Sequence, residues 1–326
     1  MTGAELKIIG GSATRYLAEK IAAKLNMELT DVISCRFADN EIFVQINESV
    51  RGADVFVIQS TSNPGNENLM ELLILLDTLK RASVKRITAV IPYYGYGRQD
   101  RKAQPRTPIT AKLVADLLTV AGAQRILLLD VHALQIQGYF NIPVDHLFAT
   151  PVLFDYFKKT KGNYVVVSPD AGGVERARFF ARLLRTNMAI IDKRRYEKNK
   201  ATIMNIIGED QIKGADLIII DDMIDTAGTL CSAANVLQEK GARNIFACAT
   251  HGLFSADAIQ NINGSTLSKV VVTDSIYFDK NRTDAHKIET LSISGLLADA
   301  IERIHKDRSV SPLFLDAESN HLIGLE

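Results

Sequence analysis

Short apolar runs, rich in isoleucine and valine and bounded by charged residues or glycine, recur along the whole chain. They show little polar alternation, which is typical of strands buried on both faces of a parallel sheet. The runs lie at 6–10, 53–60, 86–94, 125–130, 164–170, 215–222, 244–250 and 269–275. Between them, stretches such as 68–82 and 109–123 repeat leucine at helical spacing, and the second ends at Gly122 as helices often do. The pattern predicts an α/β fold, with ligands at the carboxyl ends of the strands.

The length and an internal similarity predict two domains. A chain of 326 residues exceeds the size at which one hydrophobic core usually stops growing. The segment 117–135 aligns without gaps with 236–254, and both read as a helix, a Gly-Ala stop, a strand and a histidine-bearing loop. We expect similar domains at 1–148 and 149–308. The tail, 309–326, is expected to form a short apolar strand with a frayed end, able to pack back on the first domain.

Composition argues against a non-specific nucleic-acid-binding protein, a disulfide-stabilised protein and a membrane-spanning protein. The 38 basic and 38 acidic side chains cancel, so no overall field favours nucleic acid or an anionic membrane. The three cysteines form no CxxC pair, which indicates a reducing compartment without a disulfide framework. The first residues lack a secretory pattern, and no apolar run reaches the roughly 20 residues of a membrane span. We therefore expect a cytoplasmic protein.

The strongest local signal is the segment ADLIIIDDMIDTAGTL, residues 215–230. A strand ends in Asp221 and Asp222, and a turn of small residues then opens into a helix. Backbone N–H groups at such a helix start favour a phosphate. The turn comprises Asp225, Thr226, Ala227, Gly228 and Thr229, with the two hydroxyls as further donors. The paired aspartates are natural acceptors for vicinal hydroxyls, so the segment predicts a ribose 5-phosphate site. An isolated DTAGT turn could equally just cap a helix.

Two cationic segments and two strand ends are further candidates. The loop 97–108 carries three arginines, a lysine and two prolines, and can close over a polyphosphate. The segment 191–206 is also basic and could stabilise charge on a transferred diphosphate. His132 and Asp170 each follow a strand, so they can meet at a shared sheet edge. Each of these features alone is more often a solvated surface or a structural histidine.

The segment 215–230 resembles the phosphoribosyl-diphosphate motif shared by type I phosphoribosyltransferases and ribose-phosphate pyrophosphokinases. Further segments, in order along nearly the whole chain, look like pyrophosphokinase signatures: 49–61, 68–82, 93–102, 108–118, 130–140, 168–177 and 191–195. Departures from the common pattern are modest, such as Gly97, Thr107 and Asp257. The resemblance implies two parallel-sheet domains of the type I phosphoribosyltransferase kind. It also implies transfer of the β,γ-diphosphate of Mg-ATP to the C1 hydroxyl of ribose 5-phosphate, with release of AMP, for nucleotide biosynthesis.

The resemblance also implies roles for individual residues, which the residues alone do not establish. Lys193 and Arg195 would be catalytic, and His132 and Asp170 would hold Mg²⁺. ATP would contact His132, Arg98 and Gln99. The adenine would lie against Phe37, Asp39 and Glu41 of a neighbouring subunit in a homo-oligomer, commonly a hexamer.

Two alternatives remain open. A type I phosphoribosyltransferase would share the segment 221–229 but would leave the loop 97–108 without a clear task. A regulatory subunit would keep the fold and lose catalytic positions, whereas those positions are present here. No Walker loop, GxxxxGK[ST], is present, so the use of ATP follows from the resemblance.

Overall fold

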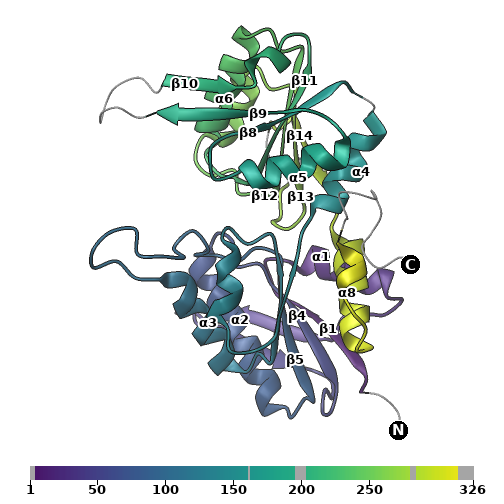
Figure 1. The fold of residues 1–326 in the computed structure, drawn as a ribbon. Coiled ribbons are helices and arrows are strands. Elements are labelled where there is room, and N and C mark those ends of the chain that lie inside the picture. The colour runs from purple at the N-terminus through teal and green to yellow at the C-terminus, as the bar shows by residue number, and fades with distance from the viewer. Residues whose placement is uncertain (1–3, 161, 195–202, 280–283, 315–326) are drawn as a thin grey trace. The chain divides into compact units, whose positions relative to one another are not determined.

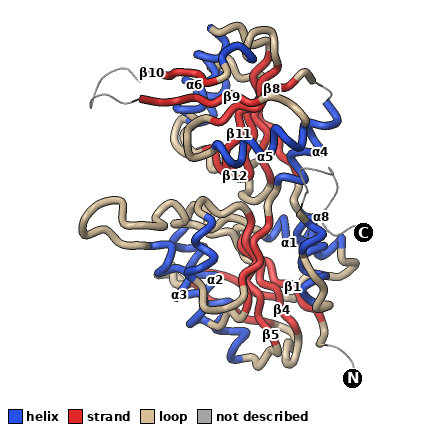
Figure 2. Tube along the Cα trace, viewed as in Figure 1, coloured by secondary structure: helices blue, strands red, loops and turns tan. Residues whose placement is uncertain are grey.

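The computed structural model describes residues 4–160, 162–194, 203–279 and 284–314, which form two compact units (Figure 1). Of the described residues, 4–148, 275–277 and 293–313 form unit 1, and the others form unit 2. Each unit has a central, mainly parallel sheet with helices on its faces, as Figure 2 shows by the red strands between blue helices. The predicted α/β class is therefore confirmed.

Unit 1 is built on a five-stranded sheet in which all neighbouring strands are parallel. Its order is β1 (Leu6–Gly10), β4 (Asp54–Ile58), β5 (Arg86–Ile91), β6 (Arg125–Leu129), β7 (Val144–Leu147). Helices α2 (Gly65–Arg81) and α3 (Thr110–Ala121) cover one face, and α1 (Arg15–Lys24) and α8 (Ser294–His305) lie side by side on the other (Figure 1). Strand β4 is buried throughout, as the run 53–60 predicts. An antiparallel hairpin, β2 (Val32–Arg36) with β3 (Ile42–Ile46), stands beside α2.

Unit 2 is built on a seven-stranded sheet. Its order is β10 (Ile203–Ile207), β9 (Met188–Arg194), β8 (Tyr164–Ser168), β11 (Asp216–Ile224), β12 (Asn244–Gly252), β13 (Lys269–Thr273), β14 (Ile288–Leu291). Only the β9–β10 pair is antiparallel among these described strands. Helices α4 (Thr150–Thr160) and α5 (Val174–Leu184) bury one face, and α6 (Gly228–Glu239) and α7 (Ala258–Gly264) bury the other. The strand order reverses between β8 and β11, which is where open α/β sheets bind ligands.

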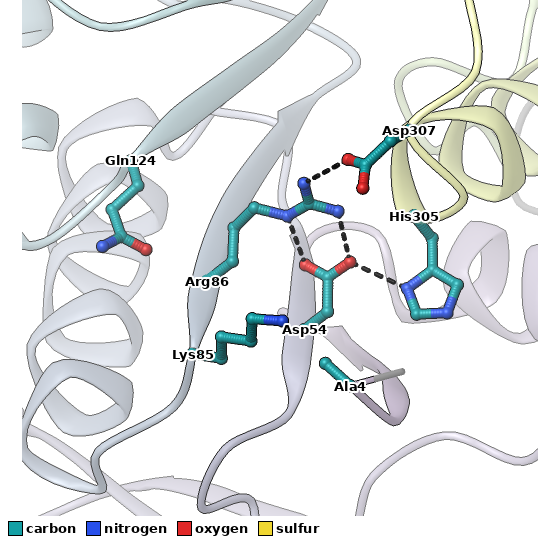
Figure 3. A pocket seen from close by; sticks show the side chains of 7 residues that line it. All are labelled: Ala4, Asp54, Lys85, Arg86, Gln124, His305 and Asp307. Carbon is teal, nitrogen blue, oxygen red and sulfur yellow. Dashed lines mark hydrogen bonds and ion pairs between the residues drawn. The ribbon is translucent and has the colours of Figure 1, made fainter. Parts of the chain in front are cut away.

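The two units repeat an ion pair at the amino ends of neighbouring strands. In unit 1, Arg86 at the start of β5 makes a bidentate pair with the buried Asp54 at the start of β4, at 2.8 and 2.6 Å (Figure 3). His305 at the end of α8 lies 2.8 Å from the same carboxylate. In unit 2, Arg243 pairs with the buried Asp216 at the start of β11. This repeat adds to the internal similarity seen in the sequence.

Some expectations differ from the structure. The segment 293–308 was expected in the second domain but groups with unit 1, because the apolar face of α8 packs against α1. Within the tail, Ser311–Leu313 forms a 3₁₀ turn (η4) and not a strand, and 315–326 lie outside the described residues. His251, expected in a loop, is buried within β12. Over the part of the chain that the structure describes, no helix has both the length and the apolar character of a membrane span.

Candidate functional site

A cavity of about 180 Å³ lies in unit 2 at the carboxyl ends of β8 and β11. It therefore occupies the point where the strand order reverses. Both apolar and polar side chains line it. The lining residues are Pro169, Asp170, Ile219, Asp221, Met223, Ile224, Asp225, Thr226, Ala227, Thr229, Leu230, Ala247 and Cys248. Most of the residues predicted from the segment 221–229 thus line one cavity, together with Asp170.

The turn between β11 and α6 is held in one conformation. Ala227 has a left-handed backbone, with φ of 59°, and its carbonyl accepts the N–H of Cys231 at 2.9 Å. Asn261 of α7 donates to the carbonyl of Thr226 at 3.1 Å, and the N–H of Ser255 donates to the carbonyl of Asp225 at 3.1 Å. Helix α6 begins at Gly228, so its first N–H groups lack partners within the helix. Such a fixed turn is suited to binding an anion.

The two strand-end aspartates share a cationic neighbour. Asp222 is buried, and its N–H donates to Asp221 Oδ1 at 2.9 Å. Nη1 of Arg176, on α5, lies 3.5 Å from Asp221 Oδ1 and 3.6 Å from Asp222 Oδ1. The protein atoms around the Asp221 carboxylate and the nearby Asp222 raise the pKa of Asp221, and Arg176 acts against that rise. Asp221 thus lines the cavity with part of its charge offset by Arg176, whereas the buried Asp222 is not among the lining residues.

Asp170 lies in the turn that joins β8 to α5. Its Oδ1 accepts the N–H groups of Gly172 and Gly173 at 2.9 and 3.0 Å, and its carbonyl accepts the hydroxyl of Ser168 at 2.7 Å. The side chain is exposed where it lines the cavity. Because both backbone bonds use Oδ1, the carboxylate is oriented while Oδ2 can still serve a ligand.

Other predicted residues lie in unit 1. His132 is exposed and follows β6, ahead of the 3₁₀ helix η1 (Leu134–Tyr139). The expectation of one shared sheet edge for His132 and Asp170 was wrong, because β6 and β8 belong to different sheets. Arg98 and Gln99 are exposed at the start of the loop 97–108. The backbone carbonyl of Gln99 accepts the N–H of Ala111 at 3.2 Å, which ties the loop to α3.

The tip of the β2–β3 hairpin carries the residues predicted to hold adenine. Phe37 is 55% exposed, although an aromatic residue in such a stretch would more often be in the core. Its ring lies 5.5 Å from that of Phe43. Asp39 and Glu41 are also exposed, and Asp39 Oδ1 accepts the N–H of Glu41 at 3.1 Å. The tip therefore presents an aromatic face and carboxylates on the surface of unit 1.

Of the two predicted catalytic residues, one lies near the end of a described segment and the other lies outside the described residues. Lys193 is near the carboxyl end of β9, where its backbone pairs with Met204 of β10. Arg195 lies outside the described residues. Because β9 is parallel to β8, its carboxyl end lies at the same edge of the sheet as Asp170.

Two residues near the cavity were not predicted from the sequence. Arg176 contacts the aspartate pair, and Asn261 supports the turn. Arg176 lies on the segment 168–177, one of those that carry the family resemblance, but that resemblance gave it no role. No local signal marks Asn261.

Comparisons with known proteins agree with this architecture. Two protein-family models match: the N-terminal domain of ribose phosphate pyrophosphokinase at residues 6–122, and the phosphoribosyl synthetase-associated domain at 194–315. The ribose-phosphate pyrophosphokinase of Aquifex aeolicus is 53% identical over 311 residues, 95% of this chain and 99% of that protein. That of Caldanaerobacter subterraneus is 55% identical, over 95% of this chain and 98% of that protein.

A solved structure gives the same result. The phosphoribosylpyrophosphate synthetase of Mycobacterium smegmatis superposes with a TM-score of 0.87 at 42% identity, covering 93% of this chain and 99% of that one. The match therefore extends over both units and not only over the turn Asp225–Thr229. This chain belongs to the ribose-phosphate pyrophosphokinase family.

Proposed function

We propose that this protein transfers the β,γ-diphosphate of ATP to the C1 hydroxyl of ribose 5-phosphate, giving 5-phosphoribosyl 1-diphosphate and AMP for nucleotide biosynthesis. The observation that carries the proposal is the cavity in unit 2, which is lined both by residues of the turn Asp225–Thr229 at the start of α6 and by the strand-end carboxylate of Asp221. Full-length similarity to pyrophosphokinases supports the same reaction. No covalent intermediate is needed, since positioning and charge stabilisation can supply most of the catalysis.

The cavity fits a sugar that ends in a phosphate. The turn Asp225–Thr229 would bind the phosphate through backbone N–H groups at the start of α6 and through the hydroxyls of Thr226 and Thr229. Asp221 and Asp222 would accept hydrogen bonds from the ribose hydroxyls. Apolar residues such as Ile219 and Ala247 also line the cavity and would keep water away from the sugar ring.

The donor groups present fit a magnesium ion. Mg²⁺ prefers oxygen ligands and keeps several waters, so it needs few protein ligands when ATP supplies phosphate oxygens. Asp170, oriented by two backbone N–H groups, would provide a carboxylate oxygen, and His132 would contribute from unit 1. Among the described residues, no cluster of three or more metal-ligating side chains occurs. Bound Mg²⁺ neutralises phosphate charge.

The ATP site would draw on exposed groups of unit 1. Arg98 and Gln99 would contact the nucleotide together with His132, and the hairpin tip of a neighbouring subunit would hold the adenine through Phe37, Asp39 and Glu41. An exposed aromatic ring beside carboxylates is suited to a purine. This arrangement requires a homo-oligomer, which we propose to be a hexamer. We place the enzyme in the cytoplasm.

An assay of purified protein with Mg-ATP and ribose 5-phosphate tests the reaction. We expect AMP, and not ADP, to form only when both substrates are present. A protein that binds ATP without forming AMP would instead be a regulatory subunit. Formation of a nucleotide from phosphoribosyl diphosphate and a free base would identify a phosphoribosyltransferase.

Replacing Gly228 by alanine should weaken the binding of ribose 5-phosphate without destabilising the fold. A Cβ at Gly228 would meet no atom within 4 Å, so stability should stay within about 0.5 kcal/mol of the wild type. The methyl group would stand where the phosphate approaches the backbone, and we expect the KM for ribose 5-phosphate to rise about tenfold. Gly264→Ala, another glycine with open space around it, is the control and should change neither quantity. An unchanged KM in Gly228→Ala would argue against phosphate binding at this turn.

A further inference from the structure

The buried carboxylate of Glu71 accepts hydrogen bonds from three separate parts of unit 1. Glu71 lies in the second turn of α2 and is 2% exposed. Gln59, directly after β4, donates to its Oε2 at 2.7 Å, and Ser34 of β2 donates to its Oε1 at 2.7 Å. Ser12, in the turn after β1, donates through its hydroxyl and through its N–H, which lies 3.2 Å from Oε1. The carboxylate therefore joins the hairpin β2–β3 to the edge of the sheet at which β1 and β4 end.

A carboxylate suits this position because it offers only acceptors. The side chains of Ser12, Ser34 and Gln59 and the N–H of Ser12 all donate to its two oxygens. An amide in its place would turn an NH2 donor towards some of these donors. Because several bonds from different elements hold the Glu71 carboxylate, it is a fixed point from which the hairpin can be oriented.

Along the hairpin, the side chains that face unit 1 change from apolar to polar towards the tip, residues 37–41. Val32 and its cross-strand partner Ile46 pack against the core of unit 1, as does Val44. Ser34 and Arg36 follow on the same side of β2, since alternate residues of a strand face the same way. Apolar packing is non-directional, whereas a hydrogen bond requires a defined distance and angle. The orientation of the hairpin near its tip therefore depends on the bonds that Ser34 and Arg36 make.

Both of these bonds go to carboxylates on one side of α2. Ser34 donates to Glu71, and Arg36 forms an ion pair with Glu67, four residues earlier in the helix. The side chains of Arg36 and Glu67 are 43% and 49% exposed, and such exposed ion pairs contribute little to stability. A hydrogen bond to a buried carboxylate contributes more. Glu71 is therefore the stronger of the two attachments.

The tip has a fixed shape of its own. The N–H of Phe37 donates to the carbonyl of Glu41 at 2.9 Å, and the N–H of Asn40 donates to the carbonyl of Phe37 at 3.0 Å. Asn40 has a left-handed backbone, with φ of 72°, which asparagine tolerates better than most residues. Because the turn keeps its own shape, its placement depends on how the two strands that carry it are held.

We propose that Glu71 is a positioning residue that, through Ser34, holds the tip of the hairpin β2–β3 in the orientation that binds the adenine of ATP. This inference rests on the proposed function, in which that ATP belongs to a neighbouring subunit. Glu71 acts through the hairpin and does not touch the nucleotide. A tip held at the wrong angle would weaken the binding of ATP. It would leave the ribose 5-phosphate site in unit 2, and the chemical step once ATP is bound, unchanged.

The test compares Ser34→Ala with Ser34→Thr. Ser34→Ala removes the bond from the hairpin and leaves Glu71 its other donors. We expect its KM for ATP to rise about fivefold, while kcat and the KM for ribose 5-phosphate change less than about twofold. Ser34→Thr keeps the hydroxyl and places a β-branched residue in a strand, so all three quantities should match the wild type.

Three further variants complete the comparison. Glu67→Gln removes only the exposed pair with Arg36 and should raise the KM for ATP less than about twofold. Ser309→Ala is the control, because Ser309 is an exposed serine of unit 1 whose hydroxyl bonds Ser311, and it should match the wild type. Glu71→Gln should raise the KM for ATP at least as far as Ser34→Ala. If Glu71→Gln fails to fold, the two variants of Ser34 decide.

The outcomes separate this inference from the reaction itself. Absence of AMP formation by the wild type would reject the proposed function. An active wild type, with Ser34→Ala unchanged in its KM for ATP, would reject only the role of Glu71. An equal rise in the KM for both substrates, or a fall in kcat alone, would also reject that role. The same holds if Ser34→Thr loses as much as Ser34→Ala, since the hydroxyl would then not be the cause.

Discussion

AMP release by the Lys193→Ala variant should be slower than that of the wild type by at least about 100-fold, with the KM for ribose 5-phosphate changed less than about fivefold. The transferred diphosphate gains charge on its oxygens as the bond to the leaving AMP breaks, and a fixed cation stabilises that charge in the transition state. The backbone of β9 carries Lys193 to the edge of the sheet at which Asp170 and the cavity lie. Removing this cation should therefore lower kcat more than it weakens substrate binding.

The control for Lys193 is a lysine of the same unit at the surface. Lys240 pairs with Glu209 at 2.8 Å, and both side chains are largely exposed, so Lys240→Ala should keep kcat within about twofold of the wild type. Single-turnover rates measured with saturating ATP and ribose 5-phosphate separate the chemical step from product release. Equal rates for Lys193→Ala and the wild type would show that the charge at residue 193 has no part in the reaction.

The Asp54→Ala variant should lose about 3 kcal/mol or more of stability. The Asp54 side chain is 3% exposed and accepts two bonds from Arg86, and it also lies against His305 (Figure 3). Without Asp54, the Arg86 guanidinium would remain half-buried beside His305 with its main partner gone. The contact joins β4 and β5 to the end of α8, so the loss should weaken the attachment of that helix.

Asp307 provides a matched control, because it pairs with the same arginine. Its carboxylate lies 3.2 Å from Arg86 Nη1 but is 85% exposed, so Asp307→Ala should cost less than about 1 kcal/mol. Urea unfolding followed by circular dichroism measures both variants, and the transition of Asp54→Ala should move to a clearly lower urea concentration. If both variants unfold with the wild type, the buried pair does not stabilise unit 1.

The parallel sheets could be predicted from sequence because a strand that is buried on both faces appears as a short continuous run of apolar residues. An apolar run such as 164–170 can be identified as a strand without knowing which other strands it pairs with. Strand β8 lies within that run. The hairpin strands β2 and β3 were not predicted, although β3, with the sequence IFVQI, is itself a short apolar run; its alternate residues are exposed, unlike those of the sheet strands. The placement of α8 in unit 1 was also not predicted. It depends on contacts with α1, which lies far away in the sequence.

The candidate site, too, could be predicted from the sequence only in part. The turn Asp225–Thr229 could be predicted because one continuous segment supplies the strand end, the small residues and the helix start. Arg176 comes from another element, and nothing in the spacing of α5 shows that it reaches Asp221. Likewise, the sequence places His132 and Asp170 after strands but does not show that these strands belong to different sheets. Functional groups that lie close together along the chain can be predicted from the sequence. Contacts between elements that are far apart in the sequence can be found only from the folded structure.

The most direct measurement is a crystal structure of the protein with ribose 5-phosphate. We expect the phosphate to accept hydrogen bonds from backbone N–H groups of the turn Asp225–Thr229, and the ring hydroxyls to face Asp221 and Asp222. A ligand bound at full occupancy elsewhere, with this turn empty, would contradict this proposal.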